Sequence, residues 1–192
     1  MGILLGFAPF IAFAAIERTV GPDEGLLAGA LIAAGLLIRD LMRRGPVAHG
    51  RAPKVLDIGT TLLFGALAIY APVSHANWTS LGVRLCVDAG LLAIVLVSMA
   101  IRRPFTLQFA SEQASPEHRH SQSFIRTNYV IAGAWAVAFL ALAAADLVML
   151  YMPTVPPHVG IGMTVIALVG AIKFTGFYPA YVRRMAAGKA PA

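Results

Sequence analysis

Three charged side chains inside otherwise apolar stretches could form a polar cluster. Arg84 and Asp88 lie four residues apart, a spacing that places both on one face of a helix and lets them pair. Asp146 lies near the end of a later stretch that would run in the opposite direction, so its carboxylate can reach the same depth. Because a charge in hydrocarbon is costly unless it is paired or hydrated, we predict an outer cluster of these three residues.

A second set of polar side chains, Asp57, Asn128 and Lys173, is predicted to form an inner cluster. Asp57 and Asn128 begin two apolar stretches on the same side, and Lys173 lies within the last stretch. For both clusters the leading interpretation is ion pairing that holds helices together. A polar path for ions, protons or a small solute and a catalytic site are the alternatives. The two clusters would lie at different depths, so they do not make up one site.

No motif of a common catalytic or cofactor-binding type accompanies these residues. The chain has no phosphate-binding glycine loop, no nucleophile elbow and no His-Glu-x-x-His. His118 and His120 stand in a polar segment without a nearby cysteine, which is a poor ligand set for a metal. We therefore predict no catalytic residue, no metal site and no cofactor.

The composition indicates a membrane protein rather than a soluble one. Apolar residues make up 58% of the 192 residues and charged residues only 12%, against roughly 25% in soluble domains. So few charges cannot supply a polar surface. The net charge of +6 comes from short segments between apolar stretches, so we interpret it as an orientation signal and exclude nucleic-acid binding.

The lengths of the apolar stretches predict how often the chain crosses a membrane. Each approaches the roughly 20 residues that a helix needs to cross about 30 Å of hydrocarbon. We predict an all-α, polytopic transmembrane bundle of six helices, arranged as three hairpins in a single domain. A polar segment over residues 102–127 is predicted to be a cytoplasmic loop. The predicted helices cover residues 3–17, 25–41, 54–71, 83–101, 128–152 and 159–182.

The positions of lysine and arginine support this count and give an orientation. Of the 15 Lys and Arg residues, 12 lie in or beside the segments after the second, fourth and sixth predicted helices. The opposite segments hold only Arg18, with Arg84 at a helix edge. The positive-inside rule then places the basic segments and both termini in the cytoplasm. The 12 residues are Arg39, Arg43, Arg44, Arg51, Lys54, Arg102, Arg103, Arg119, Arg126, Arg183, Arg184 and Lys189.

The segment just after the fourth predicted helix combines two arginines with aromatic side chains. Arg102 and Arg103 precede Phe105 and Phe109, with Gln108 between the two aromatic residues. We predict that this segment lies in the headgroup layer, with its aromatic side down and its arginines toward anionic lipid. The alternative is a segment that binds a partner protein.

The order of several short motifs resembles that of the intracellular septation protein A family of bacterial inner membranes. The motifs are Phe7-Ala8-Pro9-Phe10, Phe64-Gly65-Ala66-Leu67, Trp78, Arg102-Arg103-Pro104 and Asn128 followed by Trp135-Ala136. The chain departs from the family pattern after Trp78, where Thr79-Ser80 replaces a Lys-Pro pair, and in the longer polar segment 110–125.

This resemblance implies a small, multi-pass protein of the inner (plasma) membrane that supports envelope synthesis, division or membrane integrity through partner proteins. It supplies no catalytic residue. Membrane lipids and other envelope proteins are the expected partners. A small transporter or channel is an alternative function, in which the intramembrane charges of a homodimer line a polar path. A membrane enzyme acting on lipid or quinone is the other alternative.

Overall fold

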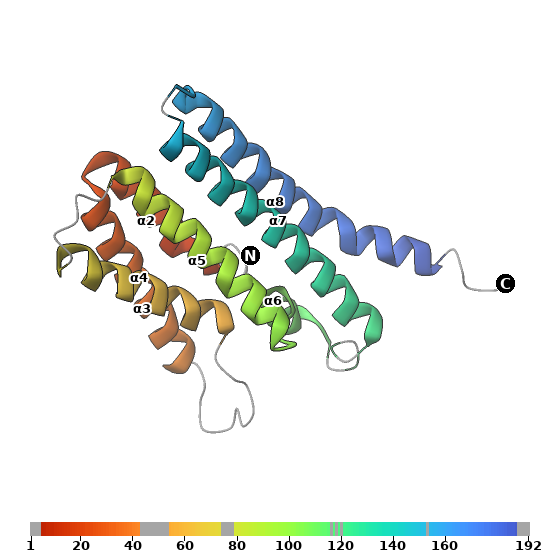
Figure 1. Ribbon diagram of the computed structural model, residues 1–192. Coiled ribbons are helices and arrows are strands. Elements are labelled where there is room, and N and C mark those ends of the chain that lie inside the picture. Colours follow the sequence, from red (N-terminus) through yellow and green to blue (C-terminus); the bar gives the residue numbers. More distant parts are fainter. Residues whose placement is uncertain are drawn as a thin grey trace. The chain divides into compact units, whose positions relative to one another are not determined.

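The chain is built of α-helices in the part that the structure describes. The computed structural model describes residues 5–42, 54–73, 79–115, 117, 119, 121–152 and 154–187. Within these ranges there are seven helices and no strand, which confirms the all-α prediction (Figure 1). The helices are α2 (Ala8–Thr19), α3 (Pro22–Met42), α4 (Val55–Val73), α5 (Ser80–Ala100), α6 (Phe105–Gln113), α7 (Gln122–Tyr151) and α8 (Pro157–Ala187).

Four of these helices are long and apolar enough to cross a membrane. They are α3, α5, α7 and the part of α8 from Pro157 to Met185. The apolar part of α4, Val55–Ala71, is shorter, and α2 has 12 residues, which span about 18 Å. The four long helices overlap the predicted stretches, whereas six crossings and a hairpin order remain a prediction.

The segment predicted to be a loop is largely helical. Within residues 102–127, α6 occupies Phe105–Gln113 and α7 begins at Gln122, six residues before its predicted start at Asn128. The hydroxyl of Ser121 accepts a hydrogen bond from the backbone N–H of Phe124 at 3.2 Å and so caps α7. The apolar pattern located the span of α7 but not its polar first turns.

The chain divides into two compact units, Met1–Ile94 and Val95–Ala192. In the first unit, side chains of α2, α3, α4 and α5 share an apolar core. The Phe64 ring of α4 lies 5.0 Å from the Phe10 ring and 5.8 Å from the Phe13 ring, both of α2. The buried residues of this core are Phe13, Leu26, Phe64, Ala71, Val83 and Val87.

Glycine lets the helices of the first unit approach closely. A Cβ placed on Gly29 of α3 would lie 2.6 Å from Cδ1 of Phe64, so only a hydrogen atom fits there. Gly59 of α4 meets the side chain of Ile94 of α5 in the same way, with 2.8 Å to Cγ1. Such close approach is how helices gain van der Waals contact in lipid, where no hydrophobic force brings them together.

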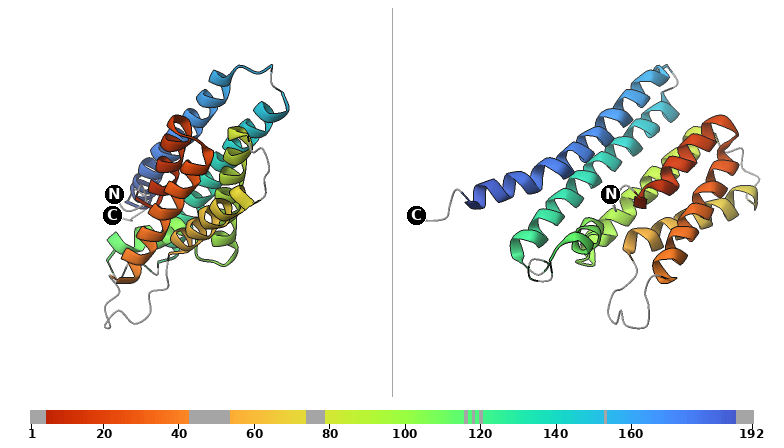
Figure 2. Two further views of the ribbon diagram at one scale, coloured as in Figure 1. Left: turned by 90° about the vertical axis from the view of Figure 1, so that its left-hand side faces the viewer. Right: turned by 180° about the vertical axis from the view of Figure 1, so that it is seen from behind.

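The second unit is built around the pair α7 and α8, which run side by side and antiparallel (Figures 1 and 2). The indole N–H of Trp135 donates to the Thr175 hydroxyl at 3.0 Å, and Gly160 contacts Met149 near the far end of the pair. In the most apolar part of α7, its candidate membrane span, 44% of the residues are buried, against 11% for α8. The helix α8 therefore contacts the protein along one narrow face only.

A matched pair of glycines on α3 tests the close approach in the first unit. Gly29→Ala forces Cβ into the Phe64 ring, and we expect a loss of about 1–3 kcal/mol, as for other overpacked sites. At Gly35 no atom lies within 4 Å of the place that a Cβ would take, so Gly35→Ala is expected to be neutral or stabilising because alanine favours helix. Thermal unfolding in detergent measures the stability of both variants relative to the native chain. Equal effects of the two changes would contradict the assigned contact.

Candidate functional site

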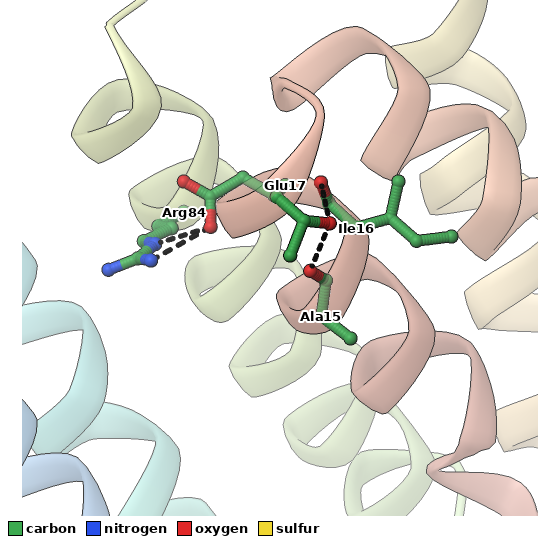
Figure 3. A network of polar contacts seen from close by, with 5 residues as sticks. Ala15, Ile16, Glu17 and Arg84 are labelled. Carbon is green, nitrogen blue, oxygen red and sulfur yellow. Dashed lines mark hydrogen bonds and ion pairs between the residues drawn. The ribbon is translucent and has the colours of Figure 1, made fainter.

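The first unit holds an ion pair between α2 and α5. Nε and Nη2 of Arg84 donate to the same oxygen, Oε2 of Glu17, at 3.1 and 2.8 Å (Figure 3). The Glu17 side chain is only 3% exposed, and that of Arg84 is 27% exposed. Glu17 lies in the last turn of α2, where the Thr19 hydroxyl also donates to the carbonyl groups of Ala15 and Ile16. The short helix α2 is therefore joined to α5 by a closed charge pair.

This geometry adds a residue to the predicted outer cluster. The guanidinium of Arg84 binds Glu17, which no spacing in the sequence had singled out, and the expected pairing of Arg84 with Asp88 remains a prediction. Asp88 is half-buried on α5 in the first unit, and Asp146 is buried on α7 in the second unit. The grouping of Asp146 with the other two remains a prediction. Glu17 could have been found, because it is the only acidic residue in the first predicted helix.

The predicted inner cluster is divided by the pairing of α7 with α8. The hydrogen bond between Trp135 and Thr175 places Lys173 level with about residue 137 of α7, nine residues or about 14 Å along the helix from Asn128. Lys173 is exposed, whereas Asn128 is buried and donates from Nδ2 to the carbonyl of Phe124 at 2.9 Å. These two side chains do not meet. Asp57 lies in the first unit, where its carbonyl accepts bonds from the hydroxyl groups of Thr60 and Thr61.

The helix α6 is tied to both of its neighbours by hydrogen bonds. The Ser98 hydroxyl at the end of α5 accepts from the N–H of Phe105 at 3.2 Å. The Thr106 hydroxyl donates to the carbonyl of Asn128 on α7 at 2.7 Å. These bonds satisfy polar groups of buried residues and fix the start of α6 against α7.

The aromatic side chains of α6 face the protein. Phe105 is fully buried and Phe109 is 4% exposed, and the Phe105 ring lies 6.5 Å from that of Trp135. Positions four residues apart share a helix face, so packing α6 on α7 buries both rings together. The prediction that these rings face lipid is therefore wrong, whereas the position of the segment in the headgroup layer remains a prediction. Arg102 and Arg103 are exposed and Gln108 is half-buried, so these three side chains keep access to the surface.

Arg102 occupies a backbone position that usually holds glycine. The N–H of Arg102 bonds to the carbonyl of Met99 and the N–H of Arg103 to that of Ser98, the two bonds of a Schellman motif that ends α5. The φ of Arg102 is +59°, the only positive value for a non-glycine residue in the described part of the chain. An arginine pays a conformational penalty there that glycine would avoid.

No cation-binding set emerges from the described residues. They contain no group of three or more His, Cys, Asp or Glu side chains that could hold a metal ion. His118, His120 and Trp78 lie outside the described residues. Arg119 is described, and its Nε donates to the carbonyl of Ala114 at 3.0 Å.

The chain matches no family model, no curated protein and no solved structure. Two pairs of side chains, Arg84 with Glu17 and Trp135 with Thr175, form hydrogen bonds between helices and hold these helices together. The charged side chains of Arg102, Arg103 and Lys173 are exposed and so are among those available to other molecules.

A double-mutant cycle tests the ion pair. Arg84→Met leaves the buried Glu17 carboxylate without its cation, and we expect a loss of about 3 kcal/mol, the lower end for a buried pair because Arg84 is 27% exposed. Adding Glu17→Gln removes the stranded charge, so the double variant should be more stable than Arg84→Met alone. Reversible unfolding in bicelles gives the free energy of unfolding of Arg84→Met, of Glu17→Gln and of the double variant. Additive effects would show that the two side chains are not coupled.

The strained position at the end of α5 gives a separate prediction. Arg102→Gly should stabilise the protein by about 1 kcal/mol, because glycine adopts a positive φ without strain. Arg103→Gly removes the neighbouring charge without relieving a positive φ, so it should not stabilise. The unfolding midpoints of the two variants, measured at equal salt concentration, test this prediction. The assignment fails if Arg102→Gly is the less stable of the two.

Proposed function

We propose that the protein is a non-enzymatic, multi-pass protein of the bacterial inner membrane that supports the cell envelope or division by binding other proteins. The observation that carries this proposal is the closure of the polar contacts between its helices. Arg84 is held by Glu17, and Trp135 by Thr175, so these groups act as links between helices rather than as reacting groups. The resemblance to the intracellular septation protein A family supports the same role.

The distribution of arginine in the second unit supports a cytoplasmic assignment for one end. Arg126 on α7 and Arg184 on α8 lie level with each other, since both are nine residues from the Trp135–Thr175 bond. Arg102 and Arg103 share that end, because Met99 just before them bonds to Tyr129. The opposite end, residues 147–157, has neither lysine nor arginine. By the positive-inside rule the arginine-rich end is cytoplasmic.

The helix α6 is the best-placed cytoplasmic surface for a partner. Its apolar side is buried against α7, so α6 is held in place, and the exposed Glu112 and the half-buried Gln108, four residues apart, reach the surface at one edge of that side, which we call the α6 face. A held helix loses little conformational freedom on binding, which favours recognition of a partner.

Crosslinking in intact cells tests this function. Mild crosslinking followed by purification of the full chain should recover proteins of envelope synthesis or division. The double variant Gln108→Lys, Glu112→Lys should reduce that recovery, because it reverses the charge of the α6 face. The control Gln122→Lys, Ser123→Lys adds the same side chains at the exposed start of α7 and should have no effect. Clean purification without any envelope or division protein would refute the proposal.

A further inference from the structure

Lys173 lies near the middle of the candidate membrane span of α8, on the side that faces away from α7. That span covers Pro157–Met185, so its middle is residue 171, about 3 Å along the helix from Lys173. Ala171 is buried and Thr175 bonds to Trp135, and each is two residues, or about 200° of helix rotation, from Lys173. The lysine is therefore opposite the contact with α7. It is exposed, and no described residue forms an ion pair with it.

A lysine at this place needs a partner, because a charge at the bilayer centre is costly unless it is paired or hydrated. The headgroups at the cytoplasmic end are a poor partner. A helical side chain leaves the backbone toward the N-terminus, which for Lys173 means away from Arg183 and Arg184 at the basic end. Ten residues, or about 15 Å, separate Lys173 from Arg183.

The surface around Lys173 is shaped for another helix. Gly170 and Gly176 lie three residues before and after the lysine, and nothing lies within 4 Å of a Cβ placed on either. Val169 and Phe177, four residues before and after it, are exposed. Small residues beside a polar side chain allow a second backbone to come close enough for a direct interhelical bond.

We propose that this face of α8, defined by Val169, Gly170, Lys173, Gly176 and Phe177, docks a transmembrane helix of a different protein that carries an aspartate or glutamate at mid-membrane depth. The carboxylate pairs with Lys173, and the two glycines admit the backbone of the partner. This inference rests on the proposed function, in that it names the chemistry of one partner. A symmetric contact between two copies of α8 is disfavoured, because it would bring two lysines together in a medium of low dielectric constant.

Photocrosslinking in native membranes tests the docking face. A benzophenone side chain at Val169 or Phe177 of the full chain should yield an adduct with a second polypeptide. The same probe at Ile172 is the control, because that exposed position has nearly the same depth but is rotated by about 100°. Mass spectrometry of the adduct should identify a membrane protein with an Asp or Glu inside an apolar span.

Variants of Lys173 test the role of the charge. Lys173→Met keeps the length of the side chain and should lower the adduct yield by about tenfold, the size expected for one interhelical polar contact. Lys173→Arg keeps the charge and should retain the adduct. Because methionine is apolar, Lys173→Met should unfold in detergent no more readily than the native chain, which separates lost binding from lost folding. Lys173→Asp combined with lysine at the identified acid should restore the adduct.

Each contrary result overturns the inference. These results are an adduct with lipid only, an adduct of two copies of this chain, no adduct, equal yields at Ile172, or a yield unchanged in Lys173→Met. None of these results would change the recovery of partner proteins through the α6 face. Failure at Lys173 is therefore distinguishable from failure of the proposed function.

Discussion

The requirement that charges within apolar helices be paired accounts for the best-defined contact of the first unit. Glu17 is almost completely buried, and its carboxylate accepts hydrogen bonds from both Nε and Nη2 of Arg84. Breaking the pair would leave a carboxylate without a cation in an apolar environment, so the pair holds α2 and α5 in one register. Since α2 has only 12 residues, this charge pair adds to the packing of Phe10 and Phe13 in fixing the position of α2.

Close packing also holds the helices together, and the extent of packing differs between helices. In the first unit Gly29 admits the Phe64 ring, and the Phe10 and Phe13 rings surround it. In the second unit α7 contacts α6 on one side and α8 on another, whereas α8 keeps most of its surface outside these contacts. The same helix that is least covered carries Lys173, so the uncovered surface is not uniformly apolar.

The sequence predicts elements of this fold better than contacts between them. Long apolar stretches located α3, α5, α7 and α8, because their length is a property of the chain alone. The partner of Arg84 was missed because a spacing of four residues is visible in the sequence, whereas Glu17 lies 67 residues away. The helix α6 was missed because Phe105 and Phe109 fit a lipid-facing segment as well as a buried one. The register of α7 against α8, which separates Asn128 from Lys173, depends on the Trp135–Thr175 bond.

The polar groups of the chain fall into two classes with different consequences. Glu17 binds Arg84 and Trp135 binds Thr175, so these side chains link helices and stabilise the fold. Arg102 and Lys173 are exposed and each carries a penalty, a positive φ for Arg102 and an intramembrane charge for Lys173. The two hydrogen bonds of the Schellman motif offset the first penalty within the chain, whereas no described residue forms an ion pair with Lys173. A carboxylate beside α8 is the group whose charge would offset the second penalty.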